Sequence, residues 1–302
     1  MCIGYIACPT KKLKIMFITC MGFGCNAAGV VSCRIIDSPR ERIIAILTNN
    51  FTPCNGRFPT LIALITMFFI GFSSNSVLNS FICAIYLSGI IILGLLMTFL
   101  TSKILSTTIL KGLPSFFTLE LPPYRKPQFG KVIIRSVFDR TLFVLGRAIL
   151  VAAPAGVVIW LLSNIFVGDL SILNHISNFL DPFARIFGLD GIILVAFILG
   201  FPANEIVIPI MIMGYLCRGS LVEYENLTEL KTLFLSNGWT WLTALCTSLF
   251  CLMHWPCSTT CLTIKKECSS VKWTLLSFAI PTVLGFLVCF IVASFSRLLG
   301  LA

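Results

Sequence analysis

Charged residues are scarce in this sequence, and their scarcity excludes a water-soluble globular protein. Only 11% of the 302 residues are charged, whereas 57% are hydrophobic; a soluble chain has about 25% charged residues. Three stretches carry no charge, at 58–102, 148–167 and 273–296, and each is long enough for the roughly 20 residues that cross a bilayer. The composition predicts an all-α, polytopic integral membrane protein whose surface contacts lipid.

Motifs of hydrolytic enzymes are also missing. The sequence has no Gly-x-x-x-x-Gly-Lys-[Ser/Thr] phosphate loop, no Gly-x-Ser-x-Gly elbow and no His-Glu-x-x-His pair. Its opening, MCIGYIACPTKKLK, lacks the apolar stretch of a signal peptide. The net charge of +10 comes from basic residues in short connectors, a pattern that orients membrane helices. We therefore expect neither an enzyme nor a nucleic-acid partner.

The apolar segments predict several spans with polar connections. Segment 58–102 is too long for one helix, and Ser73-Ser74-Asn75-Ser76 divides it into two spans. The connector 103–140 is basic and therefore predicted to be cytoplasmic, with an interfacial helix near its end. Further spans are predicted near 141–167, 239–264 and 273–297, with an acid-leaning loop after the first of them. The 14 cysteines lie mostly in apolar runs, so we expect no disulfide framework.

Segment 191–217 is predicted to form a re-entrant hairpin. Pro202 and Pro209 interrupt it, and Glu205 would cost about 2.5 kcal/mol or more at the centre of a membrane helix. If this segment crossed the membrane, the acidic loop 223–229 would be cytoplasmic and the basic stretch 265–272 external, which inverts the usual charge bias. A hairpin that returns to its own side removes the conflict.

Two passages in different halves of the chain share a pattern. Gly22-Phe23-Gly24-Cys25-Asn26 precedes Thr52-Pro53-Cys54-Asn55, and Gly200-Phe201-Pro202-Ala203-Asn204-Glu205 precedes Trp255-Pro256-Cys257-Ser258. Broken helices in corresponding positions of two halves mark transporter sites, because their freed backbone groups can replace the hydration shell of a cargo. Gly22, Gly24 and Gly200 are expected to give the backbone its freedom at the breaks. The alternative is that short strings recur by chance in a low-complexity apolar chain.

The motifs offer soft and hard metal ligands together. They supply three thiols, one carboxylate and two amides: Cys25, Cys54, Cys257, Glu205, Asn26 and Asn204. Such a mixture suits a divalent transition metal, and a carboxyl at membrane depth is itself a functional signal. Each Cys could instead pack as a small hydrophobe, and each Asn could cap a helix. His254 and Cys261 share a helix face with Cys257, although a lone His beside Pro256 is more often a packing residue.

Several strings, in this order, resemble ferrous iron transport protein B, the FeoB family: GFGCNAAGVVSCR, SPRER, TPCNGRFPTL, ELPPYRKP and GFPANEIVIPI. The resemblance begins near Phe17 and covers nearly the whole chain. It implies a permease with two Gate domains, related to nucleoside-recognition modules, that carries Fe2+ inward across a bacterial cytoplasmic membrane. It also places the iron-path cysteines at Cys25, Cys54 and Cys257. The family usually has Lys where this chain has Asn204, so Glu205 lacks a local counter-ion.

The resemblance further implies a division of the chain. We expect an N-terminal stub at 1–14, a first Gate domain at 15–120, a cytoplasmic linker with an interfacial helix at 121–140, and a second Gate domain with the last transmembrane helices at 141–302. The family's cytosolic GTPase domain is absent from this sequence, so GTP would act only through a separate domain. That domain, small Feo accessory proteins and further copies of the chain are the expected partners. A nucleoside transporter and a non-transporting assembly protein or inert fragment remain alternatives.

Overall fold

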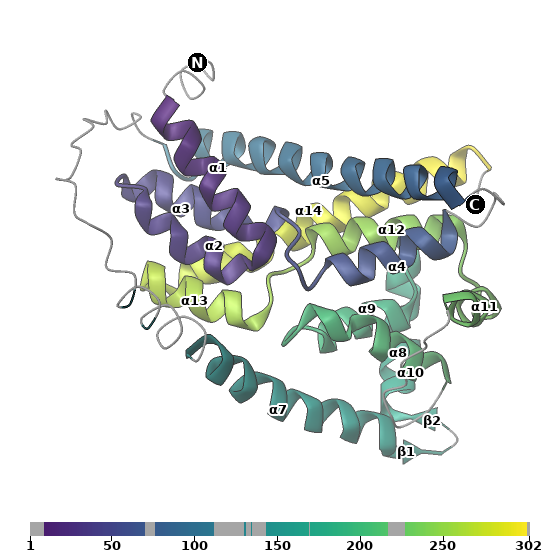
Figure 1. The fold of residues 1–302 in the computed structure, drawn as a ribbon. Coiled ribbons are helices and arrows are strands. Elements are labelled where there is room, and N and C mark those ends of the chain that lie inside the picture. The colour runs from purple at the N-terminus through teal and green to yellow at the C-terminus, as the bar shows by residue number, and fades with distance from the viewer. Residues whose placement is uncertain are drawn as a thin grey trace.

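The computed structural model describes residues 9–69, 76–111, 130, 134, 143–168, 170–216 and 227–300, and helices dominate them. The first half contains short helices followed by one long helix (Figure 1). Its elements are α1 (Pro9–Gly24), α2 (Asn26–Ser32), η2 (Cys33–Ile35), α3 (Pro39–Thr48), η3 (Asn49–Phe51), α4 (Phe58–Phe68) and α5 (Ser76–Thr107). Helix α1 thus begins inside the predicted N-terminal stub.

The second half has a similar mixture of short and long helices. It contains α7 (Phe143–Asn164), the antiparallel strands β1 (Phe166–Val167) and β2 (Leu170–Ser171), α8 (Ile172–Ile186), α9 (Gly191–Leu199), η5 (Asn204–Ile206), α10 (Val207–Leu216), α11 (Leu227–Ser236), α12 (Trp241–Met253), α13 (Ser258–Cys268) and α14 (Val271–Leu298). Helices α7 and α14 lie at the predicted spans 141–167 and 273–297, and of these two α14 is long and apolar enough to cross a membrane.

The long helices carry the surface expected for lipid. Val77–Thr107 and Val271–Leu298 are each long and apolar enough to cross a membrane. Large apolar side chains on them lie exposed, among them Phe81, Ile85 and Phe295, as is expected of helices that contact lipid. Figure 1 shows α5 and α7 on opposite sides of the short helices. The all-α membrane fold predicted from the composition is confirmed.

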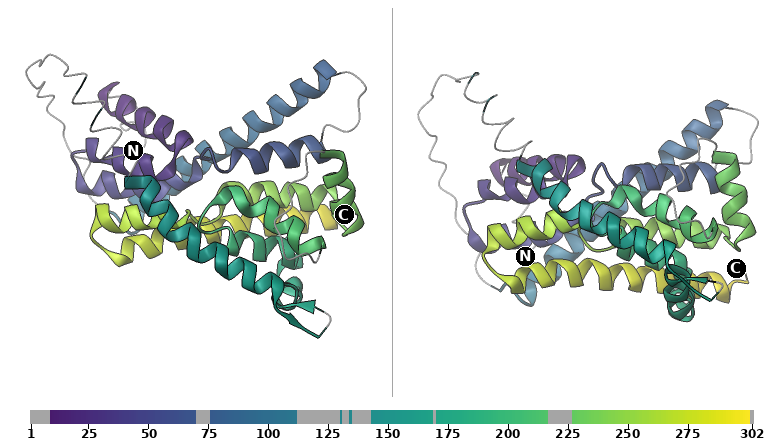
Figure 2. Two further views of the ribbon diagram at one scale, coloured as in Figure 1. Left: turned by 60° about the horizontal axis from the view of Figure 1, so that its bottom comes forward. Right: turned by 90° about the horizontal axis from the view of Figure 1, so that it is seen from below.

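Each half extends one short helix towards the other half. Helix α4 of the first half packs on α11 and α12, whereas α13 of the second half packs on α2. Figures 1 and 2 show the result: α1, α2 and α3 gather at one end with α13, and α9, α10 and α11 gather towards the other end with α4. Arg34 in η2 and Glu267 in α13 join the halves through two hydrogen bonds of 2.7 and 2.6 Å. The repeats therefore exchange helices across a shared interface.

Helices α9 and α10 form an antiparallel hairpin. A methyl group added at Gly200 would lie 2.6 Å from Val207 Cγ2, and one at Gly214 would lie 2.9 Å from Ile192 Cγ2, so both ends of the pair are in contact. At the base, Tyr215 donates its hydroxyl hydrogen to Asp190 and accepts a 2.6 Å hydrogen bond from Trp239 Nε1. This hairpin is the shape that the predicted re-entrant segment requires.

Two sequence-based expectations about helices were wrong. The segment 239–264 is not one span, because α12 ends at Met253 and α13 begins at Ser258. Pro256 has no N–H to continue the helix, and His254 and Cys257 have extended ψ angles of 175° and 159°. The predicted acid-leaning loop contains the β1–β2 pair and α8. Residues 73–75 and most of the predicted interfacial helix lie outside the described residues.

Candidate functional site

The first helix break has the same backbone form in both halves. Cys25 lies between α1 and α2 with φ and ψ of −154° and 125°, and Ala203 lies between α9 and η5 with −150° and 120°. The two residues hold the same position in the repeated motif, and a buried Asn follows each of them, Asn26 and Asn204. Matching angles at matching positions argue against chance recurrence of the strings. The halves are structural repeats at this point.

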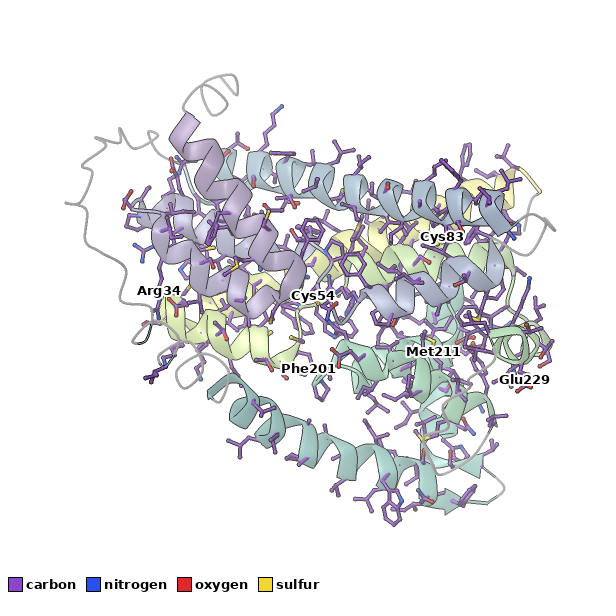
Figure 3. The ribbon with its side chains drawn as sticks, viewed as in Figure 1. Arg34, Cys54, Cys83, Phe201, Met211 and Glu229 are labelled. Carbon is purple, nitrogen blue, oxygen red and sulfur yellow. The ribbon has the colours of Figure 1, made fainter. Side chains whose placement is uncertain are left out.

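A second break lies beside the first in each half. The Asn55 N–H donates to Gly24 O at 3.3 Å, and the Ser258 N–H donates to Phe201 O at 2.9 Å. Both donors stand directly after a Pro-Cys pair, so each half places one motif cysteine, Cys54 or Cys257, next to its own Gly-Phe break. Figure 3 shows Cys54 and Phe201 near the middle of the molecule, where the breaks of both halves meet.

Two asparagines stabilise the breaks, and one of them links the halves. With its amide oriented so that the nitrogen donates, Asn26 bonds to Gly22 O and Thr52 O, each at 3.2 Å. In the second half, Asn204 Nδ2 lies 3.9 Å from Cys54 Sγ, and Asn204 Oδ1 lies 3.3 Å from His254 Nε2. The Asn204 side chain therefore lies between a thiol of the first half and an imidazole of the second.

His254 is held as a packing residue. Its side chain is buried, its Nδ1 lies 2.8 Å from Cys251 O, and its ring centroid is 4.9 Å from that of Phe197. A backbone carbonyl faces Nδ1 and the Asn204 amide oxygen faces Nε2, so each ring nitrogen has an acceptor beside it. Cys261 Sγ points to Pro256 O at 3.6 Å. These contacts favour the packing interpretation of both side chains over metal ligation.

The four predicted metal ligands share one region without forming a closed site. Glu205 is exposed and forms no ion pair within the described part of the chain. Its carboxylate lies close to Gly56: a methyl group added at Gly56 would be 3.1 Å from Glu205 Oε1. Cys54 Sγ lies 3.9 Å from Asn204 Nδ2, and the residues after Cys54 and Cys257 are hydrogen-bonded to Gly24 and Phe201 respectively. Among the described residues, however, no three His, Cys, Asp or Glu side chains come within joint reach of a metal ion. Iron ligation by these residues stays a prediction.

The motif glycines have a different role from the expected one. None of Gly22, Gly24 and Gly200 has a positive φ, so glycine is not required there for conformational freedom. A methyl group at Gly22 would instead lie 2.9 Å from Asn49 Oδ1, and one at Gly200 would lie 2.9 Å from Ala196 O. Gly24 has open space around it. Close packing explains two of these glycines, and nothing in the structure explains the third.

The residue that sequence reasoning missed is Arg57. Its side chain is completely buried at the start of α4. Nη1 donates to Asn50 O and Leu252 O, both at 2.8 Å; Nη2 donates to Asn50 Oδ1 at 3.0 Å and to His254 O and Trp255 O, both at 3.2 Å. The available signal was a lone Arg at the edge of a long uncharged segment. Asn50 is seven residues away, but the partners Leu252, His254 and Trp255 are too distant in the sequence to be identified from it.

Family models match two parts of the chain. The model described as "Nucleoside recognition", named Gate, matches residues 145–271, inside the predicted second Gate domain. The model described as "Ferrous iron transport protein B C terminus" matches residues 87–139. No solved structure matches the chain.

Curated relatives named "Fe(2+) transporter FeoB" match almost the whole chain. The relative from Staphylococcus aureus (strain COL) is 31% identical over 90% of this chain, that from Campylobacter jejuni 26% over 92%, and that from Methanocaldococcus jannaschii 27% over 95%. The chain spans 39%, 46% and 42% of their respective lengths. By these matches the chain belongs to the FeoB family and corresponds to the C-terminal region of its members.

Proposed function

We propose that this chain is the membrane-permease part of a ferrous iron transporter and passes Fe2+ through the paired helix breaks into a bacterial cytoplasm. The observation that carries the proposal is the meeting of the two breaks, where Asn204 of the second half lies 3.9 Å from Cys54 of the first. Glu205 lies beside Gly56 in the same region. The names of the relatives support iron as the cargo.

The chemistry of this region supports a moving ion. Thiols are soft ligands and a carboxylate is a hard, charged one, and a first-row divalent ion accepts both. A path must bind its ion strongly enough to admit it and weakly enough to release it. Ligands spread along the breaks, without a closed set of three among the described residues, fit an ion that passes from Cys25 towards Cys54, Cys257 and Glu205. In this role Asn26 and Asn204 assist by fixing the breaks.

Iron uptake tests this proposal. The chain would be expressed in an iron-starved bacterial strain without its own ferrous transporter, and uptake of labelled Fe2+ measured. We expect Cys25→Ser combined with Glu205→Gln to lower uptake about tenfold or more, as loss of metal ligands does. The matched control combines Cys83→Ser with Glu229→Gln, a thiol and a carboxylate that Figure 3 shows away from the breaks. Unchanged uptake by the first variant would remove Cys25 and Glu205 from the path.

The nucleoside alternative is favoured by one observation, the description of the matched Gate model. A nucleobase needs an open aromatic face on which to stack. Trp255, an aromatic residue at the second-half break, is buried and stacks on Phe278 with centroids 5.4 Å apart, so its ring is not open to a base. Competition of uptake by uridine but not by Fe2+ would reverse this preference. Retention of a phenotype after replacement of the motif residues would instead indicate an assembly protein.

The proposal includes a multi-pass location in the cytoplasmic membrane and no enzymatic activity in this chain. It also includes three classes of partner: a GTPase domain, small Feo accessory proteins, and further copies of the chain. Co-purification from membranes, followed by sizing in detergent, tests each partner separately.

A further inference from the structure

The guanidinium of Arg57 is enclosed by acceptors from both halves. Its amino groups reach carbonyls of the first half at Asn50 and of the second half at Leu252, His254 and Trp255. A further bond, from Asn50 Nδ2 to His254 O at 2.7 Å, joins the two walls directly. We refer to these carbonyls, with Asn50 Oδ1, as the Arg57 cage.

The cage has the electrostatic character of a cation site. Asn50 lies in the single turn of η3, and Leu252 and His254 lie at the end of α12, where the last carbonyls of a helix lack intrahelical partners and carry the negative end of its dipole. Broken transporter helices use such carbonyl groups to coordinate coupling ions. No ion pair of the described residues includes Arg57, so carbonyl dipoles and one amide oxygen, rather than a carboxylate, stabilise its charge.

We propose that Arg57 is a tethered cation that occupies an ion site between the repeats, and that the cage binds free guanidinium once the side chain is removed. The hydrogen bonds of the cage are made by the two terminal amino groups, while Nε has no partner in the described structure. Free guanidinium supplies the same planar pair of amino groups, so it can reproduce these bonds without a tether. Na+ and ammonium ions lack that planar fork.

Thermal unfolding of the purified full chain in detergent tests this assignment independently of iron transport. We expect Arg57→Ala to lower Tm by roughly 6–10 °C, because both walls of the cage lose their shared donor. Guanidinium chloride at about 10 mM, far below denaturing concentrations, should raise the Tm of this variant by about 3 °C or more if the cage binds it in the millimolar range. Tetramethylammonium chloride at the same concentration should have no such effect.

Arg185→Ala is the matched control, since the Arg185 side chain is 74% exposed and pairs with Asp181 of the same helix, so its removal opens no enclosed site. Equal recovery of both variants, equal recovery with both salts, or an unchanged Tm of Arg57→Ala would overturn the proposal. If Arg57→Ala does not fold, Arg57→Lys and Arg57→Gln decide the question. A cation site requires the Lys variant to be the more stable of the two, and the opposite order would also overturn it.

Discussion

Replacement of Gly94 tests how closely the long helix α5 must approach the first-half break. A methyl group at this buried position would lie 2.5 Å from Phe51 O and 3.3 Å from Leu252 Cδ1. The nearer neighbour is a backbone carbonyl at the end of η3, directly before the second break. The side chain cannot avoid this contact by changing rotamer, because alanine has none, so either α5 or η3 must move.

Gly89 in the same helix is the matched control, since a methyl group there meets no atom within 4 Å. Both Gly→Ala replacements gain about 0.8–1 kcal/mol of helix propensity. Overpacking at Gly94 costs about 1–3 kcal/mol. Because the gain in helix propensity is the same in both variants, it cancels when they are compared, and the overpacking cost remains. At about 2–4 °C per kcal/mol for a large domain, Gly94→Ala should unfold roughly 2–12 °C below Gly89→Ala.

A thiol-reactive dye can measure this difference in detergent, because Cys246, Cys251 and Cys289 are buried free thiols that unfolding exposes. The dye signal would be followed with temperature for the parent chain and the two variants. Equal midpoints for Gly94→Ala and Gly89→Ala would refute the close approach of α5 to Phe51 O.

Two further predictions concern the α9–α10 hairpin. Tyr215→Phe should lower the free energy of unfolding by about 1–3 kcal/mol, because Asp190 and Trp239 lose a shared partner. The control is Tyr86→Phe, because the Tyr86 hydroxyl has no hydrogen-bond partner within the described chain; this variant should unfold at the parent's temperature in the same thermal assay. An epitope tag at residue 225 should be reached from the external side of the membrane, as a re-entrant hairpin requires, and access from the cytoplasm alone would contradict it.

The sequence was sufficient to predict the type of fold and the positions of the breaks. Long uncharged runs predicted the membrane helices, and the two Gly-Phe strings predicted the breaks between α1 and α2 and between α9 and η5. The break after α12 was nevertheless missed. Segment 239–264 contains Pro256, but a single proline does not by itself predict a break, because one also occurs inside continuous helices of this chain, such as α14 with Pro281.

The connections of the site depended on tertiary structure. Arg57 appeared to be an ordinary boundary residue, since nothing near it in the chain indicates that carbonyls of α12 will enclose its charge. Likewise, the replacement of Lys by Asn204 was noticed, but its contacts with Cys54 and His254 join segments far apart in sequence. Local patterns identify where a helix stops; they do not identify which distant groups meet the freed ends.

The hydrogen bonds that join the two breaks within each half have a consequence for the divergence of duplicated sequences. Both bonds run from main chain to main chain, from Asn55 to Gly24 and from Ser258 to Phe201, so neither depends on the identity of a side chain. After a duplication, each copy could exchange its side chains while the backbone frame of the break persisted. Cys25 and Ala203 hold the same position with nearly the same backbone angles, so similar frames in the two halves present chemically different side chains.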